Sequence, residues 1–253
     1  MNILIMGGLG KTAEPIIELL LEQKHEVTVF DIAVHSGNRF AEQIRVLRGS
    51  VCEFNSVLDA MKGIDIVIHL AVNIQDICNE RASFDTNVFG TYNVLLSAQI
   101  NKVKKTIIAS SAPVHVLEEL DKVRCKSPFA DYYCNAGEDF TYDLTKILQE
   151  VIAENFALTY NMHILVLRLG HIVNGEKGTD LHETPLSELM YCRGGWVCKY
   201  DVARAFLSAV ESDLSGYQLL NIIGSYQASD HFDLQHTKEM IGFECAEKFL
   251  NIP

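Results

Sequence analysis

The sequence predicts an α/β fold, a doubly wound parallel sheet with helices on both faces. Short apolar runs of strand length alternate with longer stretches of helical spacing, and the first run ends in a glycine-rich loop that opens a helix. Strands buried on both faces read as continuous apolar runs, and parallel neighbours need helical crossovers between them. The 253 residues, of which 48% are hydrophobic, fit one large domain better than two independent ones.

Each predicted element follows from its apolar pattern. Strands are expected at the apolar runs 2–6, 26–31, 64–71, 105–111, 163–169 and 217–223. Helices are expected at 12–23, 84–100, 139–160 and 201–212. In a doubly wound sheet, ligands bind outside the carboxyl ends of the strands, so the residues that follow each strand are the candidates for a site.

The loop after the first strand has the features of a pyrophosphate-binding turn. Gly7 and Gly10 stand where a backbone must turn sharply, and the small Ala13 allows the following helix to pack closely. The N-terminus of that helix offers free N–H groups to a diphosphate. Asp31 ends the second strand about 20 residues later, where a carboxylate accepts both ribose hydroxyls and disfavours a 2′-phosphate. The pattern therefore favours NAD over NADP, although nearby Arg39 could soften the preference and Asp31 could instead cap its strand.

A second motif predicts proton-transfer chemistry. Tyr142 and Lys146 form a YxxxK pattern, which places both side chains on one helix face. A neighbouring ammonium lowers the pKa of a phenol towards working pH, so Tyr142 could accept a proton from a substrate hydroxyl. Ser111 ends a predicted strand 31 residues before Tyr142 and could orient the substrate oxygen. A surface helix pair would give the same spacing, but the order of glycine loop, strand-end serine and YxxxK favours a catalytic site.

Composition excludes several other classes of function. The net charge is −12, and the densest basic run, Lys102 to Lys105, is expected to be a surface turn, so no nucleic-acid partner is predicted. The seven cysteines form no CxxC pair, which argues against a zinc site or a disulfide framework. No leader pattern and no membrane-length apolar run is found. We expect a cytoplasmic protein without metal and without a membrane partner.

Together these motifs resemble the extended short-chain dehydrogenase/reductase family, the branch of NAD-dependent epimerases, dehydratases and dehydrogenases. The resemblance covers roughly residues 1–225. It is carried by MGGLGKTA, VFDI, DIVIHLA, DTNVFGTYNVLLSA, IIASSAPVH, YDLTK, LRLGHIVNG and WVCKYDVARAF. It implies a single Rossmann-type domain, 1–253, in which residues about 172–200 and 224–253 form a small C-terminal substrate-binding lobe.

The resemblance also implies roles for individual residues. Ser111, Tyr142 and Lys146 would be the catalytic triad. Cofactor contacts are implied for Gly7, Gly10, Lys11, Thr12, Asp31, Ile32, Ser50, Val51, Leu70, Ala71, Asn87, Tyr142, Lys146 and Leu169. Substrate contacts are expected from Asn73, Ser111, His171 and Arg193. Asn87 could equally be a buried helix asparagine bonded to backbone, and Asn73 a polar loop cap. A homodimer is implied, with helices 89–100 and 140–156 at its interface.

Departures from the family pattern bear on the reaction. Ser50 replaces an acidic residue near adenine, and His115 replaces a tyrosine. Ala112 and Pro113 stand where sugar-nucleotide 4,6-dehydratases carry an Asp-Glu pair and decarboxylating members a glutamate, which disfavours both reactions. The stretch between Gly175 and Trp196 is short for holding a nucleotide diphosphate.

The compact size is similar to that of uronate dehydrogenases, although their Asn-His pair and clamping arginine have no clear counterpart here. The resulting prediction is an NAD-dependent oxidoreductase that transfers hydride between NAD and a small sugar, sugar acid or cyclitol. The alternatives are an epimerase with tightly bound NAD and a catalytically silent NAD-binding sensor.

Overall fold

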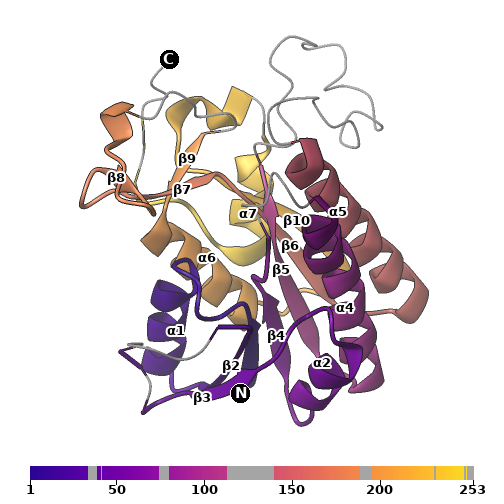
Figure 1. Cartoon of the computed structure of the whole chain (residues 1–253). Coiled ribbons are helices and arrows are strands. Elements are labelled where there is room, and N and C mark those ends of the chain that lie inside the picture. Colours follow the sequence, from indigo (N-terminus) through magenta and orange to yellow (C-terminus); the bar gives the residue numbers. More distant parts are fainter. Residues whose placement is uncertain are drawn as a thin grey trace.

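In the computed structural model, a seven-stranded parallel sheet forms the centre of the molecule (Figure 1). Its order is β10-β6-β5-β4-β1-β2-β3, and every pairing in it is parallel. The strands are β1 (Asn2–Met6), β2 (Glu26–Asp31), β3 (Arg45–Arg48), β4 (Ile66–His69), β5 (Lys105–Ser111), β6 (Ile164–Leu169) and β10 (Tyr217–Ile222). The structure describes residues 1–33, 39–40, 42–73, 80–112, 140–188, 195–230, 232–247 and 249.

Helices cover both faces of the sheet, as Figure 1 shows. One face carries α1 (Ala13–Glu22) and α6 (Lys199–Glu211), and the other carries α2 (Phe54–Ala60), α4 (Gly90–Ile100) and α5 (Phe140–Tyr160). Successive strand residues point to opposite faces, so one strand serves both cores. In β1, Ile3 and Ile5 join the first core and Leu4 and Met6 the second. The chain enters α4 through α3 (Glu80–Ser83) and a π-helical segment, η1 (Phe84–Phe89).

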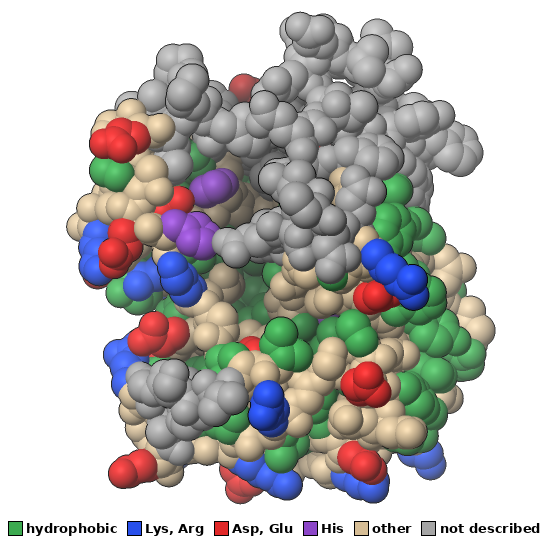
Figure 2. All heavy atoms as spheres, in the orientation of Figure 1, with side chains coloured by type: hydrophobic (Ala, Val, Ile, Leu, Met, Phe, Trp, Pro, Cys, Tyr) green, Lys and Arg blue, Asp and Glu red, His purple; other side chains and the backbone are tan. Residues whose placement is uncertain are grey.

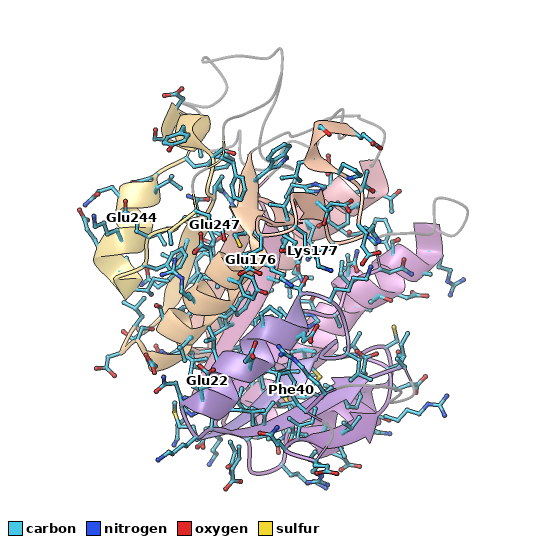
Figure 3. The ribbon with its side chains drawn as sticks, turned by 90° about the vertical axis from the view of Figure 1, so that its left-hand side faces the viewer. Glu22, Phe40, Glu176, Lys177, Glu244 and Glu247 are labelled. Atoms are coloured by element: carbon cyan, nitrogen blue, oxygen red, sulfur yellow. The ribbon has the colours of Figure 1, made fainter. Side chains whose placement is uncertain are left out.

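A smaller sheet lies beyond the carboxyl ends of the main strands. It has the order β8-β7-β9 and contains β7 (His171–Asn174), β8 (Thr179–Asp180) and β9 (Trp196–Cys198). The C-terminal segment packs on it, because a side chain at Gly175 would overlap the Glu247 carboxylate, and Figure 3 labels Glu247 beside Glu176. The remaining elements are η4 (Leu186–Glu188), η5 (Tyr226–Asp230) and α7 (Leu234–Ile241), which packs against β10.

The predicted strands and helices are confirmed, with shifts at their ends. The run 2–6 is β1 and 105–111 is β5 without change, whereas 64–71 shortens to β4 and 139–160 becomes α5. The stretch 84–100 is helical, but its first six residues form η1 rather than a regular α-helix. The missed elements are β3, α2, the small sheet and α7.

The prediction that the basic run Lys102 to Lys105 is a surface turn is wrong for Lys105. Its side chain is not on a surface turn, because only 8% of the residue is exposed. The ammonium group donates to the carbonyl oxygens of Ala209, Val210 and Ser212, which end helix α6. A cation at that position satisfies carbonyl groups that have no partner within the helix. Separately, none of the helices in the described ranges is both long enough and apolar enough to cross a membrane.

Candidate active site

Most of the predicted site residues that the structure describes lie near the carboxyl edge of the sheet, on both sides of the junction of β1 and β4. Strand order reverses there, because β2 lies on one side of β1 and β4 on the other. Met6 pairs with His69, so the glycine loop and the segment 70–73 leave the sheet side by side. Ser111 pairs with Leu169 on the next strands. This is the position at which doubly wound sheets bind their ligands.

The glycine loop makes a sharp turn against β4. Gly7 has a φ of +77°, and a Cβ placed there would lie 2.6 Å from the Ala71 backbone nitrogen. Its N–H donates to the Phe30 carbonyl at 2.8 Å, which binds the loop to β2. Among the described residues, no acceptor takes the N–H groups of Lys11 and Thr12, just before α1. Exposed amides at a helix N-terminus suit a diphosphate.

Asp31 holds the glycine loop with one carboxylate oxygen and the turn after β2 with the other. Oδ2 accepts the Leu9 N–H at 3.0 Å, and Oδ1 accepts the Ala33 N–H at 2.9 Å. Each carboxylate oxygen has a second lone pair, so these bonds leave acceptor capacity for ribose hydroxyls. The neighbouring Ile32 is 70% exposed.

Arg39 does not stand free to soften the preference for NAD. Its guanidinium forms ion pairs with Glu14 at 2.9 Å and with Glu18 at 2.6 Å, both on α1. An arginine already paired with two carboxylates has less capacity to neutralise a 2′-phosphate beside Asp31.

The segment after β3 has a tight local structure. The Ser50 hydroxyl accepts the Cys52 N–H at 3.2 Å. The Val51 side chain is buried, and a Cβ on Gly90 would lie 2.6 Å from its Cγ2. The Val51 carbonyl accepts from Asn93 at 2.9 Å. Any contact of Val51 with an adenine would therefore be made by its backbone rather than its side chain.

Asn87 holds the segment after β4 in place. Its side chain is fully buried and exchanges two hydrogen bonds with the backbone of Asn73, accepting at 2.8 Å and donating at 3.1 Å. It also donates to the Thr145 hydroxyl on α5 at 2.9 Å. Asn87 is thus a buried asparagine bonded to backbone, and its contact with the cofactor stays a prediction. Leu70 is fixed by its N–H bond to the Met6 carbonyl at 2.9 Å, which leads the chain to Ala71.

Helix α5 brings Tyr142 and Lys146 together. The Lys146 Nζ lies 6.0 Å from the centre of the Tyr142 ring. The ammonium donates to the Ala109 carbonyl of β5 at 2.9 Å and to Gln149 Oε1 at 3.0 Å. Burial lowers the pKa of Lys146 to about 8, against the opposing effect of Glu150. A cation is thus held under the phenol in a dry environment, where its field is screened little.

Ser111 ends β5 beside this pair and is 7% exposed. The preceding Ser110 faces a buried ion pair and donates to Glu150 Oε1 at 2.5 Å. Glu150 in turn accepts from Arg168 on β6, with Nη2 to Oε2 at 2.7 Å and Nε to Oε1 at 3.0 Å. The ion pair ties α5 to β5 and β6 directly behind Ser111.

The small sheet borders the other side of the site. His171 opens β7, and burial lowers its pKa, which favours the neutral imidazole. Lys11 extends from the glycine loop to donate to the Leu181 carbonyl at 2.7 Å, beside the Asp180 turn. Figure 2 shows two histidine side chains at the rim of a hollow near this turn. Within the described ranges no group of three His, Cys, Asp or Glu residues could hold a metal ion. Arg193 and His115 lie outside the described residues.

Sequence reasoning missed the polar groups behind Lys146. Gln149 Nε2 donates to the Thr91 hydroxyl at 2.8 Å, and His69 Nε2 lies 3.1 Å from the same oxygen. His69 is a buried core histidine, with 1% of the residue exposed. Thr91 and Gln149 are 58 residues apart, so no local pattern joins them. Their polarity could have marked them, since each lies within one turn of a predicted site residue, Asn87 or Lys146.

Comparisons with known proteins match the chain to a family and to several relatives. The model of the NAD dependent epimerase/dehydratase family matches residues 3–188. The L-arabinose 1-dehydrogenase (NAD(P)(+)) of Haloferax volcanii is 24% identical over 248 residues, 96% of this chain and 95% of that protein.

Two solved structures share the fold at low identity. UDP-glucose 4-epimerase from Brucella ovis, in complex with NAD, superposes with a TM-score of 0.75 at 17% identity, covering 97% of this chain and 93% of that one. A variant of uronate dehydrogenase from Agrobacterium tumefaciens, complexed with NAD, gives a TM-score of 0.73 at 14% identity, with 98% and 85% covered.

Proposed function

Because the chain belongs to the NAD dependent epimerase/dehydratase family, we propose that it is an NAD-dependent oxidoreductase acting on a carbinol of a small sugar-like substrate. The observation that carries the proposal is the buried Lys146 ammonium, held under Tyr142 at the edge of the sheet where the glycine loop turns. Such a cation favours the phenolate, which is the base that an alcohol oxidation needs. The same pair acting in the reverse direction would donate a proton to a carbonyl.

The residues present fit NAD. The Lys11 and Thr12 amides would bind the diphosphate, and Asp31 keeps lone pairs for the adenosine ribose. Arg39, paired with Glu14 and Glu18, has less capacity to neutralise a 2′-phosphate. When bound, NAD supplies the hydride acceptor. We assign to Lys146 a second role, a hydrogen bond to the nicotinamide ribose.

The protein groups divide the proton chemistry among themselves. Ser111 would donate a hydrogen bond to the substrate oxygen and hold it near the Tyr142 phenol. Lys146 would stabilise the phenolate form of Tyr142, which would then accept the proton of the substrate hydroxyl. The hydrogen bonds of Asn87 to Asn73 and Thr145 join the segment after β4 to α5. Asn87 would therefore act on the site by positioning these neighbours.

A small substrate follows from the short segment between β7 and β9. We propose that residues about 172–200 and 224–253 form the substrate lobe of a single domain, with Asn73, His171 and Arg193 contacting the substrate. A lobe of this size offers little surface to a nucleotide diphosphate. The Haloferax relative, named as an L-arabinose 1-dehydrogenase, supports a free sugar as the substrate class.

A panel of free sugars, sugar acids and cyclitols tests the function. We expect absorbance at 340 nm from NADH with at least one free aldose or uronate, and a smaller kcat/KM with NADP because Asp31 repels a 2′-phosphate. A matched panel of UDP-sugars is the control for substrate size. Turnover confined to UDP-sugars would refute the small substrate, and product formation without net NADH would refute the dehydrogenase.

An epimerase is the second candidate, and the similarity to the NAD complex of UDP-glucose 4-epimerase supports it. It uses the same base but returns the hydride to the other face of the substrate. It predicts NAD that remains bound during purification and sugar epimers formed without NADH. The same panel therefore separates the two candidates.

We also propose that the protein is a cytoplasmic homodimer formed through α4 and α5. Phe89 is 61% exposed and Tyr92 46%, at the start of α4. Tyr92 packs edge-on against Phe156 of α5, with ring centres 5.4 Å apart. Figure 2 shows hydrophobic side chains gathered over the side of the molecule that carries these helices. An apolar surface on two adjacent helices suits a self-complementary interface.

Phe89→Asp should therefore yield a monomer, because a carboxylate would be buried without a partner at the interface. Sedimentation velocity at micromolar concentration measures the change, with the unaltered protein expected to sediment as a dimer. Tyr226→Asp is the matched control, since Tyr226 is 60% exposed on η5, away from α4. The interface is wrong if the unaltered protein is monomeric or if both variants dissociate equally.

A further inference from the structure

Hydrogen bonds connect the buried side chains of His69 on β4, Thr91 on α4 and Gln149 on α5 to Lys146. The donor and the acceptor of each bond follow from the protons that each group carries. The Thr91 hydroxyl donates its one proton to the Asn87 carbonyl at 2.6 Å. Its oxygen can then only accept, and two nitrogens approach it: Gln149 Nε2 at 2.8 Å and His69 Nε2 at 3.1 Å. Both nitrogens must therefore be donors.

His69 is consistent with this direction. Donation from Nε2 requires the neutral tautomer with its proton on that nitrogen, and Nδ1 then carries a lone pair. Nδ1 is buried and has no hydrogen-bond partner among the residues that the structure describes. Burial, together with the charge of Lys146, lowers the pKa of His69 to about 3, so the ring stays neutral. The histidine therefore contributes a fixed donor and no charge.

The amide of Gln149 is fixed by the same constraint. Because Nε2 must face Thr91, Oε1 must face Lys146, whose ammonium donates to it at 3.0 Å. The flipped amide would place an NH₂ group against the ammonium and a carbonyl against an oxygen without a proton to give. Gln149 is 1% exposed, so water does not compete for these bonds.

We propose that Gln149 is a positioning residue of the active site, whose side-chain carbonyl, oriented by Thr91, holds the Lys146 ammonium under Tyr142. Together with the Ala109 carbonyl it uses two of the three ammonium N–H groups and leaves one for a ligand. Gln149 acts through Lys146 and needs no contact with the reacting atoms. The catalytic part of this assignment rests on the proposed function.

Within the described part of the chain, the acidic residues one turn before and one turn after Lys146 on α5 are the buried Asp143 and Glu150. Glu150, on the same helix, favours the ammonium but is engaged by Arg168 of β6. His69 of β4 is neutral, and the facing residues of η1 and α4 are the uncharged Asn87 and Thr91. On β5 the facing group is the Ala109 carbonyl, with the hydroxyls of Ser110 and Ser111 beyond it. A negative charge at position 149 should therefore raise the pKa of Lys146 and the pKa of Tyr142.

The first test titrates Lys146 without cofactor or substrate, by NMR of protein with isotopically labelled lysine, in which Lys146→Met identifies the signal. Gln149→Glu should raise the pKa of Lys146 by about one unit or more, because a carboxylate replaces a neutral acceptor. Gln149→Met should lower it, because the ammonium loses an acceptor. Gln218→Glu, on the edge strand β10, should leave it unchanged. Identical titration in all four proteins would overturn the proposal.

The second test uses the reaction. In Gln149→Glu, the acid limb of kcat/KM should move to higher pH by about one unit, because the added charge offsets the field that favours the phenolate. Thr91→Val should reduce kcat more than Thr91→Ser, which keeps the hydroxyl that orients Gln149. A purely structural role would lower stability without moving the pH limb, and that result would overturn the proposal. If no sugar is oxidised but the titration shifts as stated, the proposed function fails while the positioning of Lys146 stands.

Discussion

Tyr142→Phe should lower kcat by about 10² to 10⁴-fold and leave the affinity for NAD close to that of the unaltered protein. The change removes the oxygen that we propose accepts the substrate proton, but it keeps the ring next to Lys146. The groups proposed to hold the diphosphate and the adenosine ribose lie on the glycine loop and on Asp31, and they are not altered. The loss should therefore appear in turnover rather than in cofactor binding.

The measurement is NADH formation at saturating substrate, combined with calorimetric titration of NAD. Tyr160→Phe is the matched control, because Tyr160 lies on the same helix and is 48% exposed at its far end. Turnover of Tyr142→Phe at the rate of the control would rule out the phenol as the base. If a cellular role of the protein survived the change in full, an NAD-binding sensor would replace the enzyme as the preferred function.

The central fold could be predicted from the sequence because its strands are buried on both faces. The run Asn2–Met6 is continuous and apolar, and the same holds for the interior of β6. The missed strand β3 has the sequence RVLR and lies at the edge of the sheet. Because its residues are exposed or half-exposed, its sequence lacks the continuous apolar run that marks a buried strand. The small sheet was missed for a related reason, since a two-residue strand such as β8 has no period to detect.

The site could be predicted only where a residue's place along a strand decides its position in space. Asp31 and Ser111 end strands, and parallel strands end at one edge, so both reach the site without any knowledge of packing. Tyr142 and Lys146 follow from helical spacing. Gln149 and Glu150 follow from neither rule, because their roles depend on which residues of α4, β5 and β6 lie opposite them.

Helix α5 carries both residues whose positions follow from sequence spacing and residues whose roles depend on packing. Its outward end carries Tyr142, and one turn further Lys146 donates to the backbone of β5. The next residues, Gln149 and Glu150, join α5 to α4 on one side and to β6 on the other. The helix that presents the catalytic pair is therefore fixed by buried polar contacts as well as by apolar packing. Breaking the ion pair between Glu150 and Arg168 should therefore lower the stability of the fold.

Arg168→Met should show this cost, with a loss of about 3–5 kcal/mol in the free energy of unfolding. The side chains of Arg168 and Glu150 are 8% and 6% exposed, so removing the arginine leaves a carboxylate buried without its partner cation. The double variant Arg168→Met, Glu150→Leu should lose much less, because apolar residues of similar size replace a buried ion pair at little net cost. A remaining loss of about 1 kcal/mol is expected from the Ser110 hydroxyl, which then lacks its acceptor.

Urea unfolding of the single and double variants measures both free energies. The surface pair Lys62 and Asp59 is the control, because its side chains are 71% and 69% exposed, and Lys62→Met should cost about 1 kcal/mol or less. A double variant less stable than Arg168→Met would show that the pair itself, rather than the stranded charge, stabilises the fold. In the expected case, the ion pair adds little net stability over an apolar contact. Its contribution is then to hold Ser110, and with it the end of β5 that carries Ser111, against α5.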